Sequence, residues 1–136
     1  MTRKEAEMHN TIYDDFGTVI FEELYKEAEQ LRKQLIEKGI GSGQAVGMMA
    51  RNGRNFIIGI FAVVGTGACV MPMSHQLKKD ELEENIQQAR LNFILDDMSG
   101  IDPMGSTDFI ALSNGKIRVA RIENSDNSPF APHVHN

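Results

Sequence analysis

The chain of 136 residues has no tryptophan, a single cysteine and no Asn-x-Ser/Thr glycosylation acceptor. One cysteine, Cys69, excludes an intrachain disulfide and therefore the disulfide-stapled scaffolds of small secreted proteins. Long apolar stretches are also lacking, because the longest, 56–64, contains Gly59 and is too short to cross a bilayer. Residues 1–10 have no apolar segment of the kind found in secretory signals. These absences predict a cytoplasmic protein without a membrane span.

Positive charge is scarce as well. The 14 Lys and Arg residues are outnumbered by 19 Asp and Glu residues, which gives a net charge of −5. A general electrostatic attraction to nucleic acid or to anionic lipid is therefore not expected. Hydrophobic residues make up 41% of the chain and charged residues 24%, a balance typical of one globular domain.

Hydrophobic periodicity predicts alternating strands and helices. Leu24, Ala28, Leu31 and Leu35 recur at helical spacing, whereas the predicted buried strands are short, continuous apolar runs. The dipeptide Asn114-Gly115 is typical of a two-residue hairpin turn with positive φ at both positions. The expected elements are an extended piece over 17–21, helices over 22–38, 56–67 and 79–90, buried strands over 45–50, 68–73 and 92–95, a loop over 96–107, and hairpin strands over 109–113 and 116–122.

This order of elements predicts an α/β fold, with a small three-layer parallel sheet of βαβ units followed by a C-terminal β-hairpin. We expect one domain over 1–122 and a linker or tail over 123–136, where neither helical nor strand periodicity is present. If the three buried strands lie in sequence order, right-handed crossovers place both connecting helices on one face. Part of the other face would then be bare, which predicts a two-fold homodimer.

The glycine-rich segment 39–43 is a candidate phosphate loop. Such a loop follows a strand and opens a helix, so that helical N–H groups point at the anion. Here the segment follows a predicted helix and precedes a predicted strand. The sequence therefore favours a helix stop and a turn.

For the other candidate site residues, too, the sequence favours a structural role over a catalytic or metal-binding role. Zinc needs about four ligands held by folded structure, and His133 and His135 lie in the predicted tail. Cys69 is expected to be a small core residue. The remaining candidates are His9, His75 as a loop residue, Met48, Met49, Met71 and Met73 as core filler, and Asp80, Glu81, Glu83 and Glu84 as a solvated helix face. We assign no catalytic, cofactor-binding or metal-ligating residue.

The order of segments resembles the N-terminal part of the adenylate-forming ligases, which include acyl-CoA synthetases, luciferases and peptide adenylation domains. The likeness covers about residues 17 to 97. Gln44 differs from the aspartate common at its position. The matching positions are Phe21, Glu23, Leu24, Ala28, Leu31 and Leu35 of a leading helix, Gly39, Gly43 and Val46 of a turn into a strand, Asn52, the run 67–72 with Pro72, Glu81 and Leu82, and the strand 93–96.

The resemblance implies a parent enzyme that uses ATP and Mg²⁺ to activate a carboxylic acid as an acyl adenylate and transfers the acyl group to a thiol. CoA is the expected thiol, with fatty acid metabolism as the context, because no carrier or condensation segment precedes Met1. The family's phosphate loop, nucleotide contacts and catalytic lysine have no counterpart here. We therefore expect an inactive N-terminal fragment whose partner is the remainder of the ligase. The alternative is a stand-alone α/β binding or interaction module.

Overall fold

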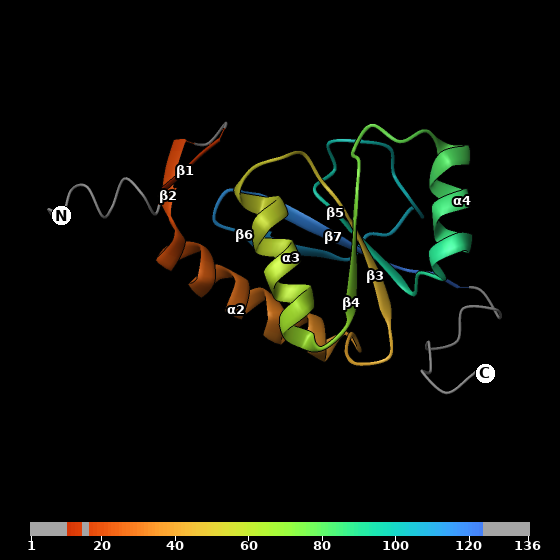
Figure 1. Cartoon of the computed structure of the whole chain (residues 1–136), viewed down its shortest axis with the longest axis horizontal. Coiled ribbons are helices and arrows are strands. Elements are labelled where there is room, and N and C mark those ends of the chain that lie inside the picture. The colour runs from red at the N-terminus through yellow and green to blue at the C-terminus, as the bar shows by residue number, and fades with distance from the viewer. Residues whose placement is uncertain (1–10, 15–16, 124–136) are drawn as a thin grey trace, which may run out of the picture.

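The computed structural model describes residues 11–14 and 17–123 (Figure 1). Helices and strands alternate through most of this chain, as the periodicity predicts. In order, the elements are β1 (Thr11–Asp14), β2 (Gly17–Ile20), α2 (Phe21–Glu37), β3 (Ala45–Met49), α3 (Arg54–Thr66), β4 (Cys69–Met73), α4 (Lys79–Ala89), β5 (Phe93–Asp96), β6 (Phe109–Leu112) and β7 (Gly115–Arg121).

Five strands form one mixed sheet in the order β4-β3-β5-β7-β6. β3 pairs in parallel with β4 and with β5, whereas β7 is antiparallel to both β5 and β6. The α/β fold with parallel βαβ units and a C-terminal hairpin is confirmed, and the hairpin continues the same sheet. A separate antiparallel ribbon, β1 with β2, precedes α2, and sequence periodicity had indicated only its second strand.

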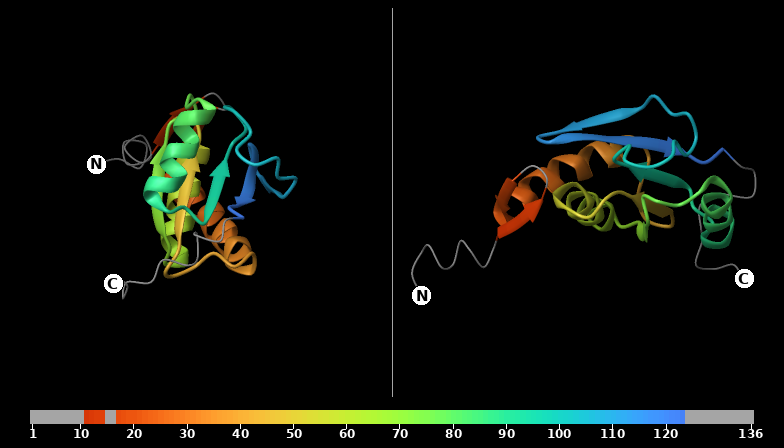
Figure 2. Two further views of the ribbon diagram at one scale, coloured as in Figure 1. Left: turned by 90° about the vertical axis from the view of Figure 1, so that its right-hand side faces the viewer. Right: turned by 90° about the horizontal axis from the view of Figure 1, so that it is seen from above.

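The strands do not lie in sequence order, and this part of the prediction is wrong. β3 lies between β4 and β5, so the crossover through α3 and the crossover through α4 run in opposite directions along the sheet. Right-handed crossovers in opposite directions lie on opposite faces. Helices therefore cover both faces, and α4 stands apart from the α2–α3 pair (Figure 2). The reason for expecting a homodimer is removed, and nothing in the described fold supports one.

The larger core lies between the sheet and the α2–α3 pair. The predicted stripe of α2 is buried, and it packs with Ile58 and Val63 of α3 against Val46 and Phe93 of the sheet. Gly59 lets α3 approach β3 closely, because a Cβ at this position would lie 2.5 Å from the Sδ and Cε atoms of Met48. Burial of this apolar face, rather than local propensity, stabilises a helix whose N-cap, Ile20, makes no side-chain hydrogen bond.

A smaller core lies under α4. Leu82 and Ile86 of this helix pack against Met49, Met73 and Ile94. Of the four methionines predicted as core filler, Met48, Met49 and Met73 are buried, and Met71 is half-buried.

Pro72 lies inside β4, where it pairs with Met48. The backbone N–H of Cys69 donates to Gln44 on the β3 side at 2.9 Å. Strand alternation then turns residue 72 away from β3, and a proline is tolerated where its missing N–H would face the open edge of a sheet. The Cys69 side chain is exposed on this edge strand, so the prediction of a core cysteine is wrong.

The hairpin turn differs from its prediction by one residue. Leu112 pairs with Gly115, so the connecting residues are Ser113 and Asn114. Gly115 has φ +129°, whereas Asn114 is not among the residues with positive φ. Tertiary contacts fix this turn: Asn55 Nδ2 donates to the Asn114 carbonyl at 2.8 Å, and the Ser113 N–H donates to Glu27 Oε1 at 2.6 Å.

Candidate functional site

The carboxyl ends of β3 and β5 are the place where an open α/β sheet usually binds ligands. The chain that leaves β3 runs through α3 to β4 on one side, and the chain that leaves β5 runs to β6 and β7 on the other side, and crevices at such a switch point are the common binding sites of the fold class. The segment 50–53 leaves β3 here and enters α3, and the loop 97–108 leaves β5. The polar side chains of these segments decide whether this end of the sheet is free to bind a ligand.

Asp97 ties the two segments together. Its carboxylate accepts hydrogen bonds from the Arg51 N–H at 3.1 Å, from the Ser99 N–H at 3.0 Å and from the Ser99 hydroxyl. Its own N–H donates to the Met49 carbonyl at 3.3 Å. The carboxylate is therefore engaged in hydrogen bonds that hold the loop, and these hydrogen bonds compete with the binding of a cation.

A buried ion pair joins β5 to β7 on the α4 side of the sheet. Asp96 and Arg118 lie directly opposite each other, and the guanidinium donates from Nε to Oδ1 at 2.9 Å and from Nη2 to Oδ2 at 2.8 Å. The Met98 N–H donates to the same carboxylate at 2.9 Å, and Asp102 lies 3.3 Å from Arg118 Nη1. Side-chain exposure is 1% for Asp96 and 10% for Arg118, so the pair is shielded from water.

The hydrogen bond to Asp96 raises the pKa of Arg118 above its ordinary value. The guanidinium therefore stays charged throughout the neutral range. Sequence reasoning missed this pair, because an isolated aspartate and an arginine 22 residues apart carry no recognisable spacing. Only the antiparallel register of β5 and β7 brings them together.

Asn55 at the start of α3 has a buried oxygen, Oδ1, with no hydrogen-bond partner. Its amide nitrogen is already used by the Asn114 carbonyl. An orphan acceptor of this kind is a candidate ligand contact, but the atom is sealed from solvent and no opening reaches it. It does not form a binding site with the neighbouring helix terminus.

A shallow hollow lies between α2 and β6. Polar side chains of α2 line one side and the last residues of β6 line the other; the principal ones are Glu27, Gln30, Gln34, Ala111, Leu112 and Ser113. These side chains do not include a nucleophile with a base placed to activate it. The hollow offers hydrogen-bonding groups without catalytic chemistry.

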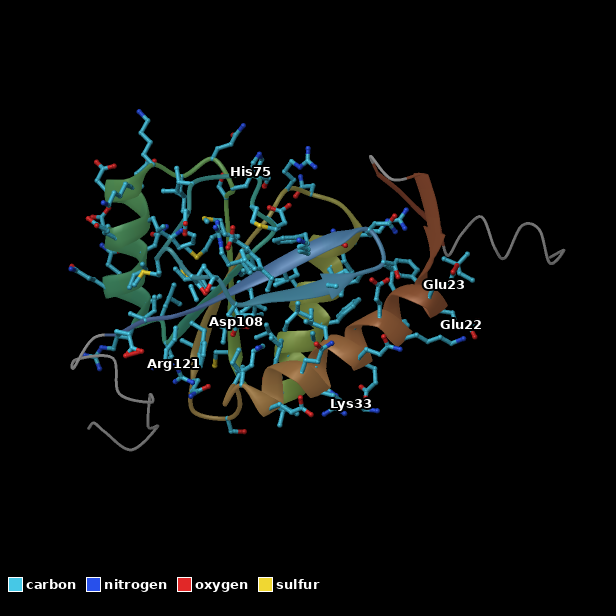
Figure 3. All side chains as sticks on the ribbon, turned by 180° about the vertical axis from the view of Figure 1, so that it is seen from behind. Glu22, Glu23, Lys33, His75, Asp108 and Arg121 are labelled. Atoms are coloured by element: carbon cyan, nitrogen blue, oxygen red, sulfur yellow. The ribbon has the colours of Figure 1, made fainter. Side chains whose placement is uncertain are left out.

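The other predicted candidates lie apart from one another. The segment 39–43 follows α2 and leads into β3, and Gly39 and Gly43 adopt φ +95° and +86°, as expected of a helix stop and turn. His75 lies in the turn before α4, where Figure 3 labels it, and His9, His133 and His135 lie outside the described residues. The acidic residues of α4 are exposed, and Glu81 Oε1 accepts the Lys78 N–H at 2.9 Å.

Within the described part of the chain, no group of three or more His, Cys, Asp or Glu residues is arranged to hold a metal ion. No helix in the same part is long and apolar enough to cross a membrane.

The family described as "AMP-binding enzyme" matches residues 2–130. The chain belongs to this family. The resemblance found in the sequence is therefore confirmed, and the match extends well beyond the residues that carried it.

Curated relatives are named as synthases. The chain is 34% identical over 78 residues to tyrocidine synthase 3 of Brevibacillus parabrevis, covering 57% of this chain and 1% of that protein. It is 35% identical over 77 residues to gramicidin S synthase 1 of Brevibacillus brevis, covering 57% of this chain and 6% of that protein. The chain thus spans a small part of the length of these relatives.

Solved structures share the fold. The N-terminal subdomain of Klebsiella oxytoca NpsA has a TM-score of 0.63 at 17% identity, covering 75% of this chain and 28% of that one. IdnL1 has a TM-score of 0.69 at 14% identity, covering 99% of this chain and 27% of that one. PA1221, a protein with adenylation and carrier domains, has a TM-score of 0.61 at 24% identity, covering 74% and 21%.

Proposed function

We propose that this chain is the N-terminal part of an adenylate-forming enzyme that activates a carboxylic acid with ATP and Mg²⁺ and transfers the acyl group to a thiol. The observation that carries the proposal is the family match over residues 2–130, on a chain whose fold is that of a solved N-terminal subdomain. We propose the domain unit 1–122, the linker 123–136 and a cytoplasmic location on the sequence grounds given above.

The described residues do not fit a nucleotide or its metal ion. The glycine-rich segment 39–43 opens a strand instead of a helix. The three aspartates near the carboxyl end of β5 are already engaged: Asp96 by Arg118, Asp97 by the Arg51 N–H, and Asp102 by Arg118 and loop N–H groups. We therefore derive no catalytic step from these residues, and the role proposed for the chain is to build and support part of the enzyme.

For the substrate and the acceptor, we propose an amino acid and a carrier-protein thiol. Relatives at 34% and 35% identity are named as synthases of the peptides tyrocidine and gramicidin S, and this favours amino-acid activation. The prediction of CoA and of fatty acid metabolism gains no support from these relatives. CoA remains the alternative acceptor, and it is distinguished by experiment.

Acid-dependent ATP–pyrophosphate exchange by the full-length enzyme, measured with a panel of amino acids and other carboxylic acids, tests the proposal. We expect exchange with one or a few amino acids, followed by transfer of label to a carrier protein and not to CoA. Transfer to CoA alone would overturn the acceptor assignment. A full-length protein without exchange on any acid would favour the interaction-module alternative.

A further inference from the structure

The loop 97–108 is fastened across the carboxyl end of the sheet. It lies beside the turn between β4 and α4 (Figure 1), and Gly100 packs so closely there that a Cβ would lie 2.0 Å from the His75 carbonyl oxygen. The next residue, Ile101, is half-buried and packs against the smaller core under α4. The loop therefore crosses from β5 toward β4 and passes over the end of β3, which lies between them.

Arg118 of β7 holds the middle of this loop to the sheet. Its Nη1 lies 3.3 Å from the Asp102 carboxylate, while its Nε and Nη2 donate to Asp96 at the end of β5. The Asp102 carboxylate also accepts the Met104 N–H at 3.2 Å and the Gly105 N–H at 2.8 Å. Asp102 directly follows the loop residue that packs against the core, so its contact with Arg118 also keeps that residue in place.

The first residues of the loop are held by a different set of hydrogen bonds. The Met98 N–H donates to the Asp96 carboxylate at 2.9 Å. Asp97 accepts the Ser99 N–H at 3.0 Å and the Arg51 N–H at 3.1 Å. Met98 has φ +66°, a left-handed conformation that side chains other than glycine rarely adopt. This backbone strain opposes the closed conformation, and the other contacts of the loop must offset it.

We propose that the segment 97–105 is a clasp, closed by the contact of Arg118 with Asp102, which opens as one unit and controls access to the carboxyl ends of β3 and β5. In the closed state, loop and backbone N–H groups occupy the Asp97 carboxylate, and the Met49 carbonyl accepts the Asp97 N–H at 3.3 Å. Opening frees these polar groups at the switch point of the sheet. Any ligand that needs them binds only the open state, so its apparent affinity is lowered by the fraction of molecules that are open. This property of the chain does not depend on the function proposed above.

Residue-resolved amide hydrogen exchange of the 136-residue chain, with and without Asp102→Ala, tests the proposal. The Asp102 side chain is 49% exposed, so its removal should leave the sheet and the buried ion pair intact. We expect the Arg51, Met98 and Ser99 amides, which donate to other carboxylates, to exchange about 10-fold faster in the variant. The Arg51 amide lies outside the loop, at the carboxyl end of β3, so its exchange measures access to that end of the sheet.

Two controls separate opening of the clasp from other effects. The Val119 amide, which donates to the Asp108 carbonyl, reports on the sheet and should exchange at the wild-type rate in Asp102→Ala. Lys38→Met is the matched control variant, because it breaks a different ion pair of the loop, between Lys38 and Asp108 at 2.7 Å, outside the clasp. It should leave the Arg51, Met98 and Ser99 amides at their wild-type rates.

Three results would overturn the proposal. The Gly105 amide loses its acceptor in Asp102→Ala, and faster exchange there without faster exchange at Arg51, Met98 and Ser99 would mean that the loop opens piece by piece. Equal acceleration of the Val119 amide would mean that the sheet itself opens. Equal acceleration of the clasp amides in Lys38→Met would mean that loss of any loop contact has the same effect, with no special role for Arg118.

Discussion

Replacing Arg118 by methionine tests the energetic importance of the buried ion pair. The substitution keeps most of the side-chain volume but leaves the Asp96 carboxylate, 1% exposed, without its bidentate partner. Of the hydrogen bonds described above to this carboxylate, only the one from the Met98 N–H at 2.9 Å is kept. Removing one member of a buried pair costs about 3–5 kcal/mol, a large part of the stability of a domain of this size.

Asp96→Asn should cost less, about 1–3 kcal/mol, because Arg118 can keep a hydrogen bond to the amide oxygen and its contact with Asp102. The double variant Asp96→Leu/Arg118→Met should lose less unfolding free energy than the sum of the losses of its single variants, since it leaves no buried charge without a partner. Lys38→Met is a matched control. It breaks the ion pair between Lys38, whose side chain is 29% exposed, and Asp108, whose side chain is 48% exposed, and should cost about 0–1 kcal/mol.

Urea unfolding monitored by circular dichroism measures these differences as shifts in midpoint at constant slope. An Arg118→Met midpoint within the error of the Lys38→Met midpoint would refute the argument, since it would mean that the carboxylate reaches water in the folded state.

Gly100→Ala should destabilise by more than 1 kcal/mol, because its Cβ would lie 2.0 Å from the backbone carbonyl oxygen of His75 and no rotamer change can relieve a backbone clash; urea midpoints check it. Gly115→Val should destabilise by about 1–3 kcal/mol, since φ is +129° and the Cβ would lie 3.0 Å from Asn55 Nδ2; a midpoint equal to the wild type would contradict this. Cys69→Ser should change stability by less than about 0.5 kcal/mol, because the side chain is exposed. Calorimetry of the chain alone with ATP and Mg²⁺ should show no micromolar binding, and tight binding would contradict its assignment as a fragment without a nucleotide site.

The sequence by itself determined most of the helices and strands, though not β1, and the family. The buried stripe of α2 could be predicted because a helix repeats every 3.6 residues, and the apolar runs of β3 and β5 because both faces of a parallel strand are covered. The glycine-rich segment 39–43 could be interpreted as a turn because its position between a helix and a strand is a local property. The family resemblance likewise rests on the order of local segments.

The tertiary structure decided the strand order, the hairpin turn and the ion pair, because these depend on contacts between distant residues. Local sequence patterns do not indicate that β3 lies between β4 and β5 in the sheet. The Asn114-Gly115 signal predicted a turn with the wrong register, since Asn55 and Glu27 fix the turn from outside the hairpin. Cys69 has the neighbours of a core residue in the sequence, yet it is exposed because β4 is the edge strand. Asp96 and Arg118 come into contact only when β5 and β7 pair. Likewise, only the strand order of the folded sheet makes β6 an edge strand.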